Sequence, residues 1–93
     1  MADMRDWLVR DPELARFMKN HEDASDVHDY MTKCIVGADA TKAQRTVIKT
    51  ITFLLPEYVT PERVASMTKT YSTEAQTAIA NYFRRFPKLQ PQG

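Results

Sequence analysis

Two short segments hold the residues of this chain that are best suited to metal binding. The first is His21-Glu22-Asp23 and the second is His28-Asp29, and together they supply the imidazole and carboxylate groups that bind Zn²⁺ and related ions. The chain has only two His residues, and no further His or Cys lies close to them in the sequence. We therefore interpret this region as a solvated acidic connection that favours the start of a helix, and we predict no metal site.

Cys34 is the only cysteine and the only candidate for a thiol nucleophile. It follows Val27 and Tyr30 at helical spacing, which places it on the apolar stripe of an expected helix, where a free thiol is unreactive. No arrangement of a nucleophile with His can be inferred from spacing, and two Gly are too few for a phosphate-binding loop. We predict that the chain is not an enzyme and uses no cofactor or small-molecule substrate.

Length and composition indicate one small globular domain. The 93 residues are 43% hydrophobic and 27% charged, within the range of folded proteins. We expect a single helical domain over residues 1–87 and a flexible C-terminal tail over 88–93. The single Cys and an N-terminus unlike a secretory signal predict a soluble, cytoplasmic protein. No run of about 18 apolar residues is present, so no membrane contact is expected.

Apolar residues recur at intervals of three and four along most of the chain, which predicts an all-α protein. Helix-capping residues and prolines divide it into a compact bundle of about five short helices, behind a leading turn that contains Trp7. The start and stop signals are Asp11 with Pro12, Ser25 with Gly37, Thr41 with Pro56, Thr60 with Pro61, and Ser72 or Thr73 with Pro87.

The apolar pattern also predicts which faces of the last two helices are buried. The fourth helix begins at Pro61 and is expected to bury Val64, Met67 and Tyr71. The last helix, over 73–86, is expected to bury Ala75, Ile79, Tyr82, Phe83 and Phe86.

Charge is distributed unevenly between the two halves of the chain. Residues 1–40 contain nine acidic and five basic residues, whereas residues 41–93 contain eight basic and three acidic ones. Such a division can hold the halves together or direct an anionic partner to the C-terminal half. Both interpretations remain open at this point.

A helix-turn-helix formed by the last two helices is one functional hypothesis. The helix over 73–86 would lie in the major groove while the preceding helix crosses the backbone. Its outward side chains include the Arg, Gln, Asn and Thr types that pair with base edges. The predicted nucleic-acid contacts are Thr73, Gln76, Thr77, Asn81 and Arg84. The net charge of only +1 and a turn without Gly argue against it, so a regulator that binds DNA or RNA is the alternative.

A module for protein–protein interaction is the leading hypothesis. Phe53 is expected to project beside an outward basic stripe formed by Lys42, Arg45 and Lys49. Trp7 lies on a turn that a small core would not fully cover. Aromatic side chains next to Lys or Arg are typical of interface hot spots. The predicted partner-binding residues are Trp7, Lys42, Arg45, Lys49 and Phe53.

An adaptor, an inhibitor or an assembly factor would fit this hypothesis. A homodimer is also expected, because self-association would cover the exposed aromatic side chains. The opposing interpretation is that the leading turn folds back and buries both Trp7 and Phe53 inside one chain.

Overall fold

The computed structural model describes residues 4–90, which form six α-helices, one short 3-10 helix and no strand. This confirms the prediction of a small all-α bundle. The helices are α1 (Met4–Leu8), α2 (Pro12–Lys19), α3 (Ala24–Ile35), α4 (Lys42–Leu54), α5 (Pro61–Thr68), α6 (Ser72–Arg85) and the 3-10 helix η1 (Pro87–Leu89).

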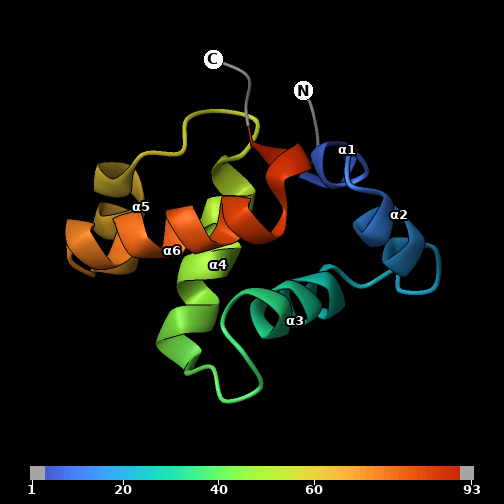
Figure 1. Ribbon diagram of the computed structural model, residues 1–93, viewed down its shortest axis with the longest axis horizontal. Coiled ribbons are helices and arrows are strands. Elements are labelled where there is room, and N and C mark those ends of the chain that lie inside the picture. Colours follow the sequence, from blue (N-terminus) through green and yellow to red (C-terminus); the bar gives the residue numbers. More distant parts are fainter. Residues whose placement is uncertain (1–3, 91–93) are drawn as a thin grey trace.

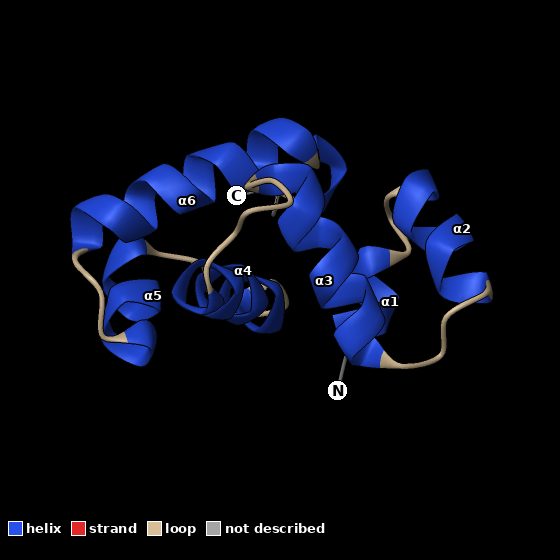
Figure 2. Cartoon of the chain, turned by 90° about the horizontal axis from the view of Figure 1, so that it is seen from below, coloured by secondary structure: helices blue, strands red, loops and turns tan. Residues whose placement is uncertain are grey.

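The helix α4 lies at the centre of the arrangement. Figure 1 shows α6 crossing α4, with α5 beside α6. Figure 2 looks along α4, with α5 on one side, α1 to α3 on the other, and α6 passing over α4. Contacts of α4 with α3, α5 and α6 join the two groups of helices. The apolar face of α4 supplies Val47, Ile48, Ile51, Leu54 and Leu55 to the core, as its periodicity predicts.

Local capping explains where several of these helices begin. The carboxylate of Asp11 accepts hydrogen bonds from the backbone N–H groups of Glu13 and Leu14, so it satisfies donors that have no partner within the helix. Thr41 and Gln44 form the predicted capping box, and the Thr60 hydroxyl accepts from the N–H of Arg63. Three of the predicted start signals are thereby confirmed.

Two other predicted helix caps are wrong. Asp23 rather than Ser25 caps α3, because its carboxylate accepts from both the backbone N–H and the hydroxyl of Ser25. The helix α6 begins at Ser72, one of the two predicted starts, but it has no side-chain cap, so the predicted capping box of Thr73 is absent and Thr73 lies inside the first turn.

The predicted inner face of the fourth helix is wrong at two positions. The helix α5 ends at Thr68, and Lys69 adopts a left-handed conformation with φ of 57°. The chain therefore turns before Tyr71, which is 77% exposed, while Met67 is 57% exposed. Val64 and Ala65 are the residues of α5 that are buried.

A polar contact lies within the core between α4 and α6. Tyr82 and Thr52 are fully buried, and their hydroxyl oxygens are 2.8 Å apart. The Thr52 hydroxyl also donates to the carbonyl oxygen of Ile48 in the same helix. This hydrogen bonding satisfies the buried tyrosine hydroxyl, which would otherwise lower stability.

The packed part of the chain extends beyond the predicted boundary at residue 87. Leu89 is fully buried, and its carbonyl oxygen accepts a hydrogen bond of 2.8 Å from Nε1 of Trp7. Leu89 therefore belongs to the core, whereas the flexibility of the rest of the tail stays a prediction. Residues 91–93 of the predicted tail lie outside the described residues.

Within residues 4–90, none of the helices combines the length and the apolar character needed to cross a bilayer.

Candidate binding surface

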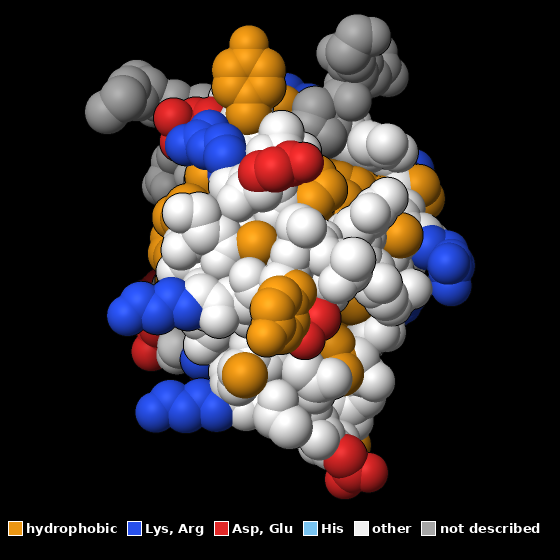
Figure 3. All heavy atoms as spheres, turned by 90° about the vertical axis from the view of Figure 1, so that its left-hand side faces the viewer, with side chains coloured by type: hydrophobic (Ala, Val, Ile, Leu, Met, Phe, Trp, Pro, Cys, Tyr) orange, Lys and Arg blue, Asp and Glu red, His pale blue; other side chains and the backbone are white. Residues whose placement is uncertain are grey.

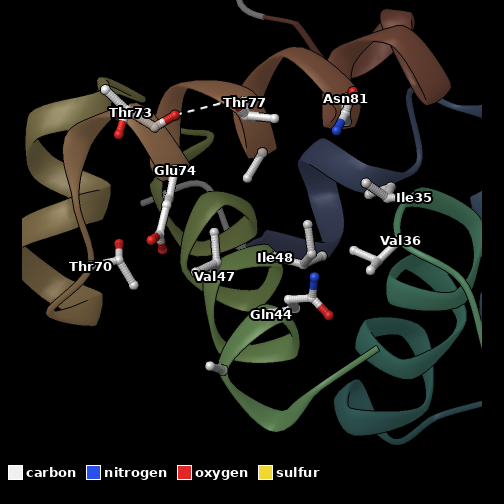
Figure 4. Close-up of a pocket in the computed structure, with 12 residues that line it drawn as sticks. Ile35, Val36, Gln44, Val47, Ile48, Thr70, Thr73, Glu74, Thr77 and Asn81 are labelled. Carbon is white, nitrogen blue, oxygen red and sulfur yellow. Dashed lines mark hydrogen bonds between the residues drawn. The ribbon is translucent and has the colours of Figure 1, made fainter. Parts of the chain in front are cut away.

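A groove lies between the N-terminal halves of α4 and α6, next to the C-terminal end of α3. It has a volume of about 560 Å³, within the range of pockets that bind ligands. Its apolar surface comes from all three helices and consists of Ile35, Val36, Ala43, Val47, Ile48 and Ala78. Figure 4 shows these helices around the groove, with Ile35 and Val36 at one end and Thr70 at the other.

Hydroxyl, amide and carboxylate groups complete the lining of the groove. They belong to Gln44, Thr70, Thr73, Glu74, Thr77 and Asn81. Glu74 is the only charged residue of the lining, and its side chain extends from α6 towards α4 in Figure 4. Its carboxylate forms no ion pair with any residue that the structure describes.

The five predicted nucleic-acid residues of α6 do not all line the groove. Thr73, Thr77 and Asn81 line the groove, whereas Gln76 and Arg84 are exposed and do not line it. The Thr77 hydroxyl donates to the carbonyl oxygen of Thr73 one turn earlier, which ties it to its own helix. The groove therefore includes polar residues that the sequence indicates only as part of an outward surface.

The predicted basic stripe of α4 lies outside the groove. Arg45 forms an ion pair with Asp29 of α3, and Lys49 places its Nζ 5.7 Å from the centre of the Phe53 ring. Lys42 is exposed in the first turn of α4, and Phe53 remains 49% exposed. The leading turn thus does not bury Phe53, while Arg45 is already neutralised within the chain.

Trp7 is held by contacts within its own chain. Besides its hydrogen bond to Leu89, its indole ring lies against the Arg10 guanidinium, whose central carbon is 3.7 Å from the ring centre. The side chain is half-buried against the core. These contacts give Trp7 a structural role in joining α1 to η1.

His28 occupies a buried position that the sequence does not indicate. It is 2% exposed, and neither ring nitrogen has a hydrogen-bond partner. Its ring lies 5.5 Å from that of Phe53, measured between centres. Burial lowers the pKa of the imidazole, and the positive charges of Lys49 and Arg45 lower it further, against an opposing effect of Asp29. The predicted solvated position of His28 is therefore wrong.

Potential metal ligands do not gather in the described part of the chain, where no three His, Cys, Asp or Glu residues could hold an ion together. His21 stacks on Phe17 and lies 3.6 Å from the Asp26 carboxylate, whereas the ring of His28 lies next to that of Phe53. Cys34 is half-buried at the edge of the core rather than fully enclosed.

Separate apolar side chains are also exposed around α5. Tyr58, Met67 and Tyr71 are each more than half exposed. Figure 3 shows this side of the molecule, with hydrophobic side chains separated by polar ones and Lys or Arg towards the margins. They do not form one continuous patch. They resemble the single hydrophobic residues that are scattered over the surface of many proteins.

The connection between α5 and α6 has the length of a helix-turn-helix turn. Lys69, Thr70 and Tyr71 join the eight-residue α5 to α6, and the left-handed Lys69 redirects the chain where Gly is common. The Thr68 and Thr70 hydroxyl oxygens lie 2.9 Å apart and brace the turn. Ala65 of α5 and Ala75 of α6 are both buried.

No protein-family model, curated protein or solved structure matches this chain. Any function must be inferred from the surfaces described above.

Proposed function

We propose that this protein is a non-enzymatic binding module that accepts a segment of a partner protein in the groove between α3, α4 and α6. The observation that supports this proposal best is the groove itself, which presents six apolar residues from three helices and is edged by polar groups. An apolar centre with a polar rim is the usual anatomy of a protein interface. The proposal keeps the predicted class of function but moves its site from the basic stripe to the groove.

Filling the groove with a large side chain tests this proposal. Ala78 lines the groove, so Ala78→Trp should occupy the space that a partner needs. Ala80 lies two residues further along α6 and is exposed outside the groove, so Ala80→Trp is a matched control. Proteins that become cross-linked to the native chain in its source cells should also become cross-linked to Ala80→Trp. They should not become cross-linked to Ala78→Trp. Equal retention by both folded variants would contradict a groove site.

Self-association remains a prediction of the same proposal. Phe53 is half exposed beside Lys49, so a second copy could cover it, whereas Trp7 is engaged within its own chain. Light scattering should give a dimer mass for the native chain and a monomer mass for Phe53→Ala. A monomer mass for the native chain at high concentration would exclude the dimer.

Binding of DNA or RNA is a second candidate, and the three-residue turn at Lys69 favours it. In this case the exposed outer face of α6, with Gln76, Ala80 and Arg84, would enter the major groove. Mobility shifts of mixed-sequence duplexes should be measured at about 50 and about 200 mM salt. Binding should weaken steeply at the higher salt concentration. Ala80→Trp and Arg84→Ala would abolish it. The absence of a shift at low salt would exclude this candidate.

A further inference from the structure

We infer that the groove selects a cationic amphipathic helix, with apolar side chains for its floor and a Lys or Arg side chain for Glu74. This inference rests on the proposed function and specifies the chemistry of the partner. The groove is long enough for a helix because its α6 wall runs from Thr73 to Asn81. At 1.5 Å per residue this wall measures about 12 Å, or slightly more than two helical turns.

The apolar lining sets the spacing of the partner's side chains. A helix that lies along such a wall presents apolar residues at positions i, i+4 and i+7, which lie on one face. These residues would contact Val36 and Ala43, which are exposed and lie opposite α6, whereas Val47 and Ile48 below them are buried. The exposed edge of the floor at Val36 would then be covered by the partner.

The charge of the lining determines the sign of the partner. Glu74 is the only ionisable residue that lines the groove, and it has no ion-pair partner among residues 4–90. A Lys or Arg on the partner would pair with this exposed carboxylate at the edge of the covered groove, which gives a modest preference for a cation. An acidic segment would gain no such ion pair, because Glu74 is the only charged residue of the lining.

The position of Glu74 also suggests a register. Its side chain lies towards the Thr70 end of the groove, while Ile35 and Val36 form the opposite end (Figure 4). The cation of the partner would therefore lie about one helical turn beyond its apolar side chains. This arrangement distinguishes the groove from the Lys49 and Phe53 stripe of α4, whose exposed charges are positive.

A double-mutant cycle with synthetic peptides tests the inference. The probe is a helical peptide of about 18 residues with Ala and Gln as its background and Leu at i, i+4 and i+7. A Lys one turn before the first Leu and another one turn after the last allow either orientation, and the matched probe has Gln at both places. Dissociation constants are measured for the native chain and for Glu74→Gln.

The control variant is Glu62→Gln. Glu62 and Glu74 are both exposed acids in the first turn of a helix, so the two changes alter net charge and helix electrostatics alike. The Lys probe should bind the native chain and Glu62→Gln about three- to fivefold more tightly than the Gln probe, a preference expected of an ion pair at a partly open site. Glu74→Gln should bind both probes equally.

The possible failures are distinguishable. Equal binding of the two probes to the native chain, or an equal effect of Glu62→Gln, would overturn the cation preference while leaving a groove that binds apolar helices. Absence of binding by either probe, or binding that Ala78→Trp does not weaken, would overturn the proposed function together with the inference.

Discussion

Among single side chains, His28 is the least compatible with its surroundings. It is buried between α3 and α4 with two unpartnered ring nitrogens, beside the positive charges of Arg45 and Lys49. Charging its imidazole there is unfavourable because burial removes water and no acceptor replaces it. The pKa of His28 therefore lies below its usual value of 6.5 in the folded protein.

His28 makes the fold sensitive to mild acid. As the pH falls below 6.5, the unfolded chain binds a proton at His28 more readily than the folded protein, so the free energy of unfolding decreases. The loss from one histidine is bounded by about 1.4 kcal/mol per pH unit. Urea unfolding at pH 7.5 and 5.5 should show this loss in the native chain, and His28→Leu should reduce it.

The second histidine supplies the control for this prediction. His21 is partly exposed next to Asp26, and its replacement in His21→Gln should leave the acid sensitivity intact. His28→Leu should match or exceed native stability at pH 7.5, because it removes two unsatisfied buried nitrogens. An unchanged pH dependence in His28→Leu would show that the acid sensitivity arises elsewhere.

At the scale of helices and turns, the junction of α5 and α6 is under local strain. Lys69 has φ of 57° and ψ of 41°, the left-handed region in which a side chain with Cβ is unfavourable. The backbone N–H groups of Lys69 and Thr70 both bond to the carbonyl oxygen of Ala65, which fixes this conformation at the end of α5. Hydrogen bonding thus maintains the turn although Lys69 is not a glycine.

Replacement of Lys69 by Gly should stabilise the protein. The change removes the strain of the left-handed residue and adds flexibility to the unfolded chain, for a net gain of about 0.5–1 kcal/mol. The same change at Lys33, an exposed position within α3, should lower stability by about 0.5 kcal/mol because Gly disfavours a helix. Denaturant midpoints measure both variants, and effects of the same sign would contradict the assigned conformation of Lys69.

At the scale of the whole molecule, one polar cluster joins both ends of the chain. Arg85 of α6 donates two hydrogen bonds of 2.9 Å to the Glu13 carboxylate of α2, and the Tyr30 hydroxyl of α3 donates to the same group. The Arg85 and Tyr30 hydrogen bonds hold the pKa of Glu13 below its usual value of 4.5. One carboxylate therefore links the neighbouring helices α2 and α3 to α6 near the other end of the chain.

Acid should weaken this link. Because the folded pKa of Glu13 is lowered, the stability that it supplies is present above pH 4.5 and is lost as the pH falls through the folded pKa. Glu13→Gln should lower stability at pH 7 by about 0.5–1 kcal/mol, as for a partly exposed ion pair, and should reduce the decline below pH 4.5. Glu57→Gln, at an exposed acid without a described ion pair, should do neither when unfolding is followed by circular dichroism.

The sequence predicts features that depend on neighbouring residues better than those that depend on tertiary packing. Asp11, Thr41 and Thr60 cap their helices as predicted, since each acts on N–H groups two or three residues away. The burial of His28 depends on α4, and the loss of Tyr71 from the core depends on the left-handed Lys69. Neither dependence is visible in apolar periodicity.

The groove could not be predicted for the same reason. Its walls come from residues 35–36, 43–48 and 70–81, and its existence depends on how α6 crosses α4 beyond the end of α3. The sequence indicates Thr73, Thr77 and Asn81 as candidates because they are polar and lie outside the apolar stripe. It gives no sign that Val36, Val47 and Ala78 lie opposite or beside them.

The most direct test of the groove as the partner site is amide shift mapping by nuclear magnetic resonance. The ¹⁵N-labelled native chain is titrated with the Lys-containing helical probe. The largest shifts should fall at residues around the groove, namely Val36, Ala43, Gln44, Val47, Thr73, Thr77 and Asn81. Largest shifts at Gln76, Ala80 and Arg84, or at Lys49 and Phe53 instead, would contradict the groove as the site of binding.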